Sequence, residues 1–552
     1  MNADLIIENA RILTMDGAQL RAEAVGVSGG RVVTIGGRDD VRASVSSRAQ
    51  VIDAGGASVL PGFIESHIHL FVGAAQLDNL SLAGVLGFDA VAKSIRQRAQ
   101  SCPDEKLIMV EQAVYGQFGE GLPITRQLLD QIIADRPLAL YAGDHHTMWG
   151  NTAALKAAGL LHGREVAAGN EVVMGEDGLA AGELREFEAF APLIALTPTG
   201  GRESLGLLGR EPGNVPTSAQ RSADSDVLRR GLAYLASHGV TSFHNMDGNA
   251  YQLQLLAEID AADGLACRAR IPFRVLPGFE LDRLTEAVEL RRRYDSAFLK
   301  ADFVKIFMDG VIEAANAYML DDYGGMPGWK GSVYFQQEEF DAICVAIDKL
   351  GFQIAVHAIG DAAVRRTLNG YEAAMKANGR RDSRHRVEHI ETLAASDIGR
   401  FAELGVICSM QPTHAVGCYF PSEPSVGLIG AERLKTAYAW QTLRNTGAEI
   451  AFSSDWPVAP INPLLGVQTA MLRGVVNDGD PAQSQSLANA LDGFTRASAY
   501  AEFSEQHRGV LKPGADADIV ILSQDIEKVA PDEIANIKAR ATICGGRPTF
   551  EA

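Results

Sequence analysis

The sequence predicts an α/β protein with a large central domain and a small β domain assembled from both chain ends. Three observations carry this prediction. The middle of the chain alternates short apolar segments with helical patterns, both ends are rich in β-branched residues and glycine-containing turns, and 552 residues exceed one ordinary hydrophobic core. Repeated βα units form parallel sheets, so the central domain is either a doubly wound sheet or a (β/α)8 barrel.

Residues 1–60 are predicted to form a hairpin-rich sheet, because short β-branched segments alternate with turns such as Gly29-Gly30. Residues 501–552 have the same character and contain a clear strand at Ala517–Leu522. Two similar ends that flank a different middle indicate one β domain built from both termini. The central domain, residues 61–500, is then inserted within it.

Within the central domain, short apolar segments recur at intervals that leave room for helices. The predicted strands are Lys106–Val114, Leu138–Ala142, Val240–Asn245, Ala269–Val275, Phe303–Phe307, Gln353–His357, His385–His389, Val406–Met410 and Glu449–Ser453. Helical patterns lie between several of them, at Glu338–Leu350, Ala362–Asn378 and Ser396–Leu404. The stretch from about residue 75 to residue 225 is too long for one or two βα units, and it is predicted to be an insertion. A surface excursion and a substrate lid fit this stretch equally well.

Composition narrows the class of partner. The net charge of −19 argues against sequence-independent binding of nucleic acids and against anionic membranes. The chain has no apolar run of the ~18–20 residues that a membrane span needs, and no secretory signal pattern at its start. Its six cysteines form no CxxC pair, which is typical of free thiols in a reducing compartment. We therefore expect a cytoplasmic protein with a small-molecule substrate, no nucleic-acid or membrane partner, and a homodimer by default.

A candidate metal site begins at His67 and His69. Both lie in Phe63–Leu70, which is predicted to be a strand. Side chains alternate faces along a strand, so the two imidazoles point the same way and can reach one metal ion. Two histidines on the polar face of an ordinary amphipathic strand would produce the same pattern, so the pair needs distant partners.

Four later strands supply such partners at or near their ends. Lys305 lies inside an apolar strand, where an ammonium is costly unless it is paired or neutralised, and His357, His389 and Asp455 end successive strands. Each residue alone is more often structural, and Asp455 could simply cap a turn. In a (β/α)8 barrel, however, the carboxyl ends of all strands face one pocket, where active sites lie.

At this point the chain resembles the amidohydrolase superfamily of metal-dependent hydrolases. Within it, the chain is similar to the YtcJ-like branch, which includes the N-substituted formamide deformylases. The resemblance covers nearly the whole chain and rests on these segments: Pro61–His69, Asp144–Leu155, Val304–Glu313, Val356–Asp361, Arg386–His389, Phe452–Asp455 and Leu511–Val520. It implies a (β/α)8 TIM barrel with a small β-sandwich domain formed by both chain ends.

The resemblance also implies a ligand set for one or two divalent metal ions. His67, His69 and Asp455 would hold the first metal, His357 and His389 the second, and Lys305, carboxylated by CO2, would bridge them. A carbamate is an anionic oxygen ligand, so carboxylation would remove the cost of a buried ammonium. Histidine-rich ligation suggests Zn2+, although other transition metals share these ligands.

Position 65 departs from the superfamily pattern. Glu65 stands where an aspartate usually precedes the two histidines. Because glutamate is longer, we expect changed geometry around the ligands.

The predicted reaction is hydrolysis of a C–N bond in a small amide, with N-substituted formamides as the candidate class. Two cations ~3.5–4 Å apart would lower the pKa of water from ~15.7 towards ~7, and the metal-bound hydroxide would attack a carbonyl carbon. Asp455 would carry the water proton to the leaving amine. His146 is the candidate donor to the oxyanion or substrate. Asp309 and Glu313 are expected either to line the substrate pocket or to cap the next helix.

Two other functions stay open at this stage. A deaminase of heterocyclic amines would use the same activated water on a ring carbon and would release ammonia. A non-catalytic binding protein on the same scaffold is disfavoured, because every ligand type is present in the expected order.

Overall fold

The computed structural model describes residues 3–119, 122–143, 147–166 and 170–552. The chain forms two compact units. Unit 1 comprises Met1–Leu70, Gly209–Glu211 and Leu232–Ala552, and unit 2 comprises Phe71–Leu208 and Pro212–Gly231.

The centre of unit 1 is a set of parallel strands. Their bounds are β8 Phe63–Ile68, β15 Val240–Asn245, β16 Arg268–Arg270, β17 Phe273–Arg274, β18 Leu299–Lys300, β19 Phe303–Phe307, β20 Gln353–Ala358, β21 Arg386–His389, β22 Ile407–Met410 and β23 Ile450–Phe452. They pair in the orders β18-β16-β15-β8 and β17-β19-β20-β21-β22-β23. Both sheets continue through consecutive chain segments, β16 into β17 and β18 into β19, and a parallel bridge joins Ile68 to Trp456 beyond β23. This arrangement is consistent with a TIM-barrel-type scaffold.

The register of these strands brings their carboxyl ends to one level. Phe307 at the end of β19 pairs with His357 of β20, and Ala358 pairs with His389 at the end of β21. Every residue of β8, β15, β20 and β21 is buried, as expected for a parallel sheet that is covered on both faces. The predicted strand Ala269–Val275 is observed as two short strands, β16 and β17.

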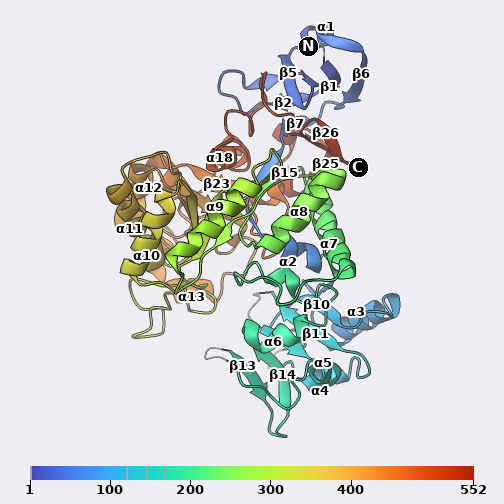
Figure 1. Ribbon diagram of the computed structural model, residues 1–552, viewed down its shortest axis with the longest axis vertical. Helices are drawn as coiled ribbons and strands as arrows, with labels where there is room; N and C mark the ends of the chain where they lie inside the picture. Colours follow the sequence, from blue (N-terminus) through green and yellow to red (C-terminus); the bar gives the residue numbers. More distant parts are fainter. Residues whose placement is uncertain (1–2, 120–121, 144–146, 167–169) are drawn as a thin grey trace. The chain divides into compact units, whose positions relative to one another are not determined.

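The connecting helices of unit 1 lie where the sequence predicts them. α10 (Gln337–Lys349), α11 (Asp361–Asn378) and α12 (Ile398–Leu404) run beside one another along the strands that they connect (Figure 1). Each presents apolar residues inward, for example Phe340 of α10 and Leu368 of α11. These helix predictions are confirmed to within a residue or two.

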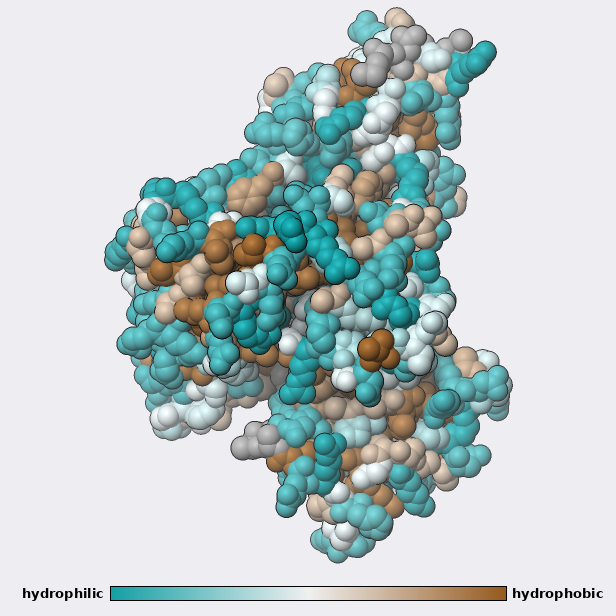
Figure 2. All heavy atoms as spheres, viewed as in Figure 1, coloured by the Kyte–Doolittle hydropathy of each residue, from teal (hydrophilic) through white to brown (hydrophobic). Residues whose placement is uncertain are grey.

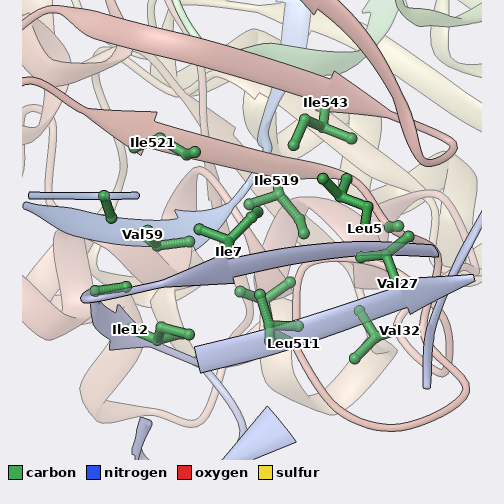
Figure 3. Packing of buried hydrophobic residues seen from close by; sticks show 14 of the residues in the cluster. Leu5, Ile7, Ile12, Val27, Val32, Val59, Leu511, Ile519, Ile521 and Ile543 are labelled. Atoms are coloured by element: carbon green, nitrogen blue, oxygen red, sulfur yellow. The ribbon is translucent and has the colours of Figure 1, made fainter. Parts of the chain in front are cut away.

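The chain ends form two further sheets of unit 1, the first from N-terminal strands alone and the second from strands of both ends. One has the order β5-β4-β1-β6, with β1 Ala3–Glu8, β4 Ala24–Ser28, β5 Arg31–Gly36 and β6 Val45–Asp53. The other has the order β26-β25-β24-β7-β2-β3, with β2 Arg11–Leu13, β3 Arg21–Ala22, β7 Ser58–Pro61, β24 Ile519–Leu522, β25 Ala539–Cys544 and β26 Arg547–Glu551. Figure 3 shows that residues from both ends, such as Ile7, Val59 and Ile519, pack in one apolar cluster. Burial of this cluster holds the two ends of the chain together.

Unit 2 has its own six-stranded sheet, in the order β13-β14-β12-β11-β10-β9. The strand bounds are β9 Leu80–Ser81, β10 Ile108–Ala113, β11 Leu138–Ala142, β12 Thr147–Gly150, β13 Glu171–Met174 and β14 Ala180–Arg185. Its helices include α3 (Phe88–Ser101) and α6 (Phe187–Ile194), and α7 (Ser218–Ser237) belongs to this unit as far as Gly231. The predicted strands Lys106–Val114 and Leu138–Ala142 are present as β10 and β11, and they pair with each other inside this sheet.

On the face that Figure 2 shows, hydrophilic side chains predominate, although apolar residues gather in places among them. Across the described residues, no helix has both the length and the apolar character needed to cross a bilayer.

Candidate metal centre

The end of β8 and the segment after β23 bring two histidines and an aspartate together. The Nε2 atoms of His67 and His69 each lie 3.4 Å from Oδ1 of Asp455. The Asp455 amide donates to the His67 carbonyl at 3.0 Å, so backbone pairing holds the carboxylate beside the histidines. Asp455 has a positive φ of 60°, a strained conformation that is common at functional sites. The two histidines therefore share a partner on one face, as their spacing predicts.

A second pair of histidines completes the cluster. The ring centroids of His357 and His389 are 4.5 Å apart, and those of His67 and His389 are 4.7 Å apart. His67, His389 and Asp455 each offer an atom close enough to the others for one ion to be bound between them. Phe307 stacks on His357 at 4.8 Å and closes the cluster on that side. The structure thus brings these four histidines and Asp455 to one place.

Carboxylates and an amide bind the outer nitrogens of three of these histidines. Nδ1 of His67 lies 2.8 Å from Glu388, and Nδ1 of His69 lies 2.8 Å from Asp247. Nδ1 of His389 lies 2.9 Å from Oε1 of Gln411. Such contacts fix ring orientation and raise the basicity of metal ligands. Sequence reasoning missed these three partners; for Asp247 the only signal was an acidic residue just after a predicted strand.

Lys305 lies on β19 and is fully buried. Its Nζ atom has no hydrogen-bond partner among the described residues and lies 4.7 Å from the centre of the Phe307 ring. Burial lowers the pKa of this amine to about 7, against the attraction of Glu388. Lys305 therefore has a neutral form available near pH 7, because burial disfavours its charged form.

The charge states of the cluster suit a divalent ion. Burial and the charge of Lys305 lower the pKa of His357 to about 3, so this imidazole is neutral, which is its ligand form. Burial alone would raise the pKa of Asp455, but His67 and His69 hold it well below its usual range. Oδ1 of Asp455 has no hydrogen-bond partner among the described residues. Neutral imidazole and a carboxylate oxygen without a partner fit a zinc-type ion.

His69 differs from His357, because its imidazole is positively charged in the metal-free protein. Burial would lower the pKa of His69, but Asp247 and Asp455 on either side raise it to about 9. His69 is therefore an imidazolium ion, with a proton on both ring nitrogens, at neutral pH before any metal binds. Binding a metal at this position must release that proton.

Glu65 supports the segment that carries Asp455. Its Oε2 atom accepts hydrogen bonds from the Ser454 amide at 2.8 Å and the Ser454 hydroxyl at 2.9 Å. Burial raises the pKa of Glu65 to about 8, despite these bonds. The glutamate thus contacts the residue before Asp455, and within the described part of the chain its other oxygen, Oε1, has no hydrogen-bond partner.

The remaining predicted site residues have different surroundings. Asp309 is buried and accepts from the amides of Tyr318, Ile359 and Gly360 at 2.8–3.1 Å, which ties its loop to the N-terminus of α11. Its Oδ1 atom also lies 3.7 Å from Nε2 of His357. Glu313 is exposed and accepts a 2.6 Å hydrogen bond from Ser425. His146 lies outside the described residues.

A second polar group lies next to the first. His389, Glu391 and His414 also offer atoms within 4.8 Å of one another. Nε2 of His414 lies 4.0 Å from Oδ2 of Asp455, and its Nδ1 lies 3.6 Å from Oε1 of Glu391. Sequence reasoning missed His414 and Glu391 because neither ends a predicted strand.

Comparison with known proteins gives a consistent result. A model of the amidohydrolase family matches residues 50–550. The putative amidohydrolase YtcJ of Bacillus subtilis is 28% identical over 96% of this chain and 96% of that protein. The N-substituted formamide deformylase of Arthrobacter pascens is 25% identical over 99% of this chain and 98% of that protein. The crystal structure of an uncharacterized metal-dependent hydrolase from Pyrococcus horikoshii covers 96% of this chain and 98% of its own at 23% identity, with a TM-score of 0.73.

Proposed function

The chain belongs to the amidohydrolase family, and from this premise we propose that it hydrolyses a C–N bond of a small amide, with N-substituted formamides as the substrate class. The resemblance inferred from the sequence motifs is confirmed by the family match. The chain has the fold of a metal-dependent hydrolase and is a hydrolase of carbon–nitrogen bonds. The formamide class is supported by the likeness to the Arthrobacter pascens deformylase.

One observation carries the proposal: predicted ligands from separate strands meet at the carboxyl ends of the parallel sheet. The Nε2 atoms of His67 and His69 each lie 3.4 Å from Oδ1 of Asp455. His357 and His389 complete the cluster. Lys305 lies on β19, next to the strand that carries His357, and its amine has no hydrogen-bond partner among the described residues. A purely structural cluster would be expected to pair these buried polar atoms.

The chain's own residues would divide the work as follows. His67, His69, His357, His389, Asp455 and Lys305 would hold the metal. A bound divalent ion would supply a lowered pKa for water and polarisation of the carbonyl group. The Asp455 carboxylate would accept the water proton and return it to the leaving amine nitrogen, because it lies beside the histidines and stays ionised.

Several finer features of this proposal stay predictions. We propose a closed (β/α)8 barrel from residues 61–500 with residues of about 75–225 as an insertion, and a β-sandwich from residues 1–60 and 501–552.

We also propose zinc as the ion, a two-ion site and carboxylation of Lys305. The neutral form of its amine, which is the form that adds CO2, is accessible near pH 7. Asp309 and Glu313 as substrate contacts, a cytoplasmic location and a homodimer stay predictions as well.

The test combines metal analysis with a substrate panel on one sample. We expect one to two divalent ions per chain, loss of activity with a chelator, and recovery with zinc. Aliphatic and aromatic N-substituted formamides are assayed for amine and formate release, beside other amides and heterocyclic amines. The variant His357→Ala should lose metal and turnover, and His507→Ala should keep both, because His507 is exposed and is not a residue of the cluster.

Two results would contradict the proposal. An active preparation without bound metal would exclude metal-dependent hydrolysis. Ammonia release from heterocyclic amines, with no cleavage of any amide, would identify a deaminase.

A further inference from the structure

An amide hydrolase needs a group that binds the negative charge developing on the carbonyl oxygen. His414 is well placed for this role. It ends the short helix η4 (Pro412–His414), which begins two residues after β22, so it lies at the same edge of the sheet as His389 and Asp455. Its ring is nearly parallel to that of His389, at 10°, with centroids 6.2 Å apart.

The Nε2 atom of His414 is buried and has no hydrogen-bond partner among the described residues, and its side chain is only 10% exposed. Nε2 lies 4.0 Å from Oδ2 of Asp455, which is too long for a direct hydrogen bond. A substrate atom between the two groups could lie within ~3 Å of both. A buried polar atom that is directed at the proposed proton carrier and left unpaired indicates a ligand contact.

Neighbouring residues hold His414 in this orientation. Its Nδ1 atom lies 3.6 Å from Oε1 of Glu391, and Oε2 of Glu391 accepts a 2.9 Å hydrogen bond from the Tyr438 hydroxyl. Glu391 is itself buried. On the other side, the ring of Phe420 packs edge-on against His414 at 5.6 Å. The ring is therefore fixed before any substrate arrives, as electrostatic catalysis requires.

We propose that His414 is a catalytic residue whose Nε2–H donates a hydrogen bond to the carbonyl oxygen of the scissile amide, and that Glu391 is its positioning residue. The assignment rests on the proposed amide hydrolysis. Each ring nitrogen of His414 faces a carboxylate oxygen, Nδ1 that of Glu391 and Nε2 that of Asp455, so both nitrogens are oriented as hydrogen-bond donors. Nε2 then acts as a donor.

The step balances with the residues named. As the water oxygen adds to the carbonyl carbon and Asp455 takes its proton, the π electrons of the carbonyl move to its oxygen. His414 stabilises that charge by hydrogen bonding and transfers no proton. When the C–N bond breaks, its electron pair goes to nitrogen, which receives the proton from Asp455, and the products are a carboxylic acid and an amine.

The competing role is metal ligation, because His389, Glu391 and His414 could together hold an ion. Metal content separates the two roles. The test variants are His414→Gln and His414→Asn, and His507→Gln makes the same change at an exposed residue that is not part of the cluster. Glu391→Gln tests positioning.

We expect H414Q to keep the wild-type metal content and thermal stability while kcat falls by about 10²–10³ and KM changes little. H414N should behave likewise, and it decides the question if H414Q does not fold. E391Q should lower kcat by a smaller factor and shift its pH profile, which a merely structural change would not do. In a second measurement, calorimetry with phenylphosphonate, a tetrahedral anion, should show a Kd at least ~10-fold weaker in H414Q than in H507Q.

Three results would overturn the assignment. Loss of metal in H414Q and H414N would make His414 a ligand. A kcat within about threefold of wild type, at full metal content, would remove it from the reaction. Equal phenylphosphonate affinity in H414Q and H507Q would show that Nε2 binds no oxyanion. The phosphonate measurement stands even if the wild type cleaves no amide, an outcome that would refute only the proposed function.

Discussion

Replacing Lys305 by methionine should stabilise the metal-free protein, although it should abolish turnover. Lys305 is fully buried on β19, and its amine has no hydrogen-bond partner among the described residues. Methionine is similar in length and flexible enough to fill the same space, and it carries no charge. The substitution therefore removes a desolvation cost and creates no large cavity.

The pKa gives the size of this cost. Burial lowers the pKa of Lys305 from 10.5 to about 7. At about 1.4 kcal/mol for each pH unit, this corresponds to ~5 kcal/mol of lost unfolding free energy at and below neutral pH. With an unfolding entropy of ~2.1 cal/mol/K per residue over the whole chain, K305M should raise Tm by about 4 °C at most.

The sign of the pH dependence follows from the same shift. Between about pH 7 and pH 10.5 the unfolded chain binds the Lys305 proton and the folded chain does not, so wild-type stability rises with pH. Burial of Lys305 lowers the free energy of unfolding by the full amount below about pH 7, and this loss disappears near pH 10.5. The gap in Tm between K305M and wild type should shrink accordingly.

The assay is thermal unfolding in chelator and CO2-free buffer at several pH values. CO2 is excluded because carboxylation would neutralise the amine. Lys300→Met is the matched control, because Lys300 lies shortly before β19 and its side chain is 40% exposed. This substitution should change the free energy of unfolding by no more than ~0.5 kcal/mol. A metal-free K305M that melts below wild type at pH 7, with K300M unchanged, would refute the reasoning about an unpaired buried amine.

Three further predictions concern the same centre. Asp455→Asn should keep most of the metal and lose turnover by at least ~10², measured by amine release, and near-normal rates would exclude it as the proton carrier. Lys305→Ala should lose activity that CO2 with a short carboxylic acid partly restores, and an unimpaired variant would exclude a bridging carbamate. Glu65→Ala should lower the unfolding free energy by about 1–3 kcal/mol and reduce kcat, because it leaves the Ser454 amide unpaired, whereas Glu65→Gln should cost less than 1 kcal/mol. Equal unfolding midpoints for the two Glu65 variants would show that the Ser454 contacts contribute nothing.

Much of the framework was readable from local pattern. The strands Val240–Asn245 and Phe303–Phe307 were predicted to the residue, because buried strands of a parallel sheet are short, continuous apolar runs between polar helical stretches. The partnership of His67 and His69 followed from alternation along one strand, and both lie 3.4 Å from Asp455. Ala269–Val275 was predicted as one strand and is two, a boundary that local pattern does not specify.

The sequence alone determined the set of candidate metal ligands of this protein. A histidine or a charged residue at the end of an apolar strand stands out from its apolar neighbours. Only the tertiary structure decided what surrounds them. Glu388 reaches His67 across 321 positions of the chain, and Asp247 reaches His69 across 178. The structure likewise placed Asp309 on three backbone amides and His414 beside Asp455. Contacts at such separations arise from strand register and loop packing, which no local spacing encodes, whereas the ligand pattern follows from the two-residue repeat of single strands.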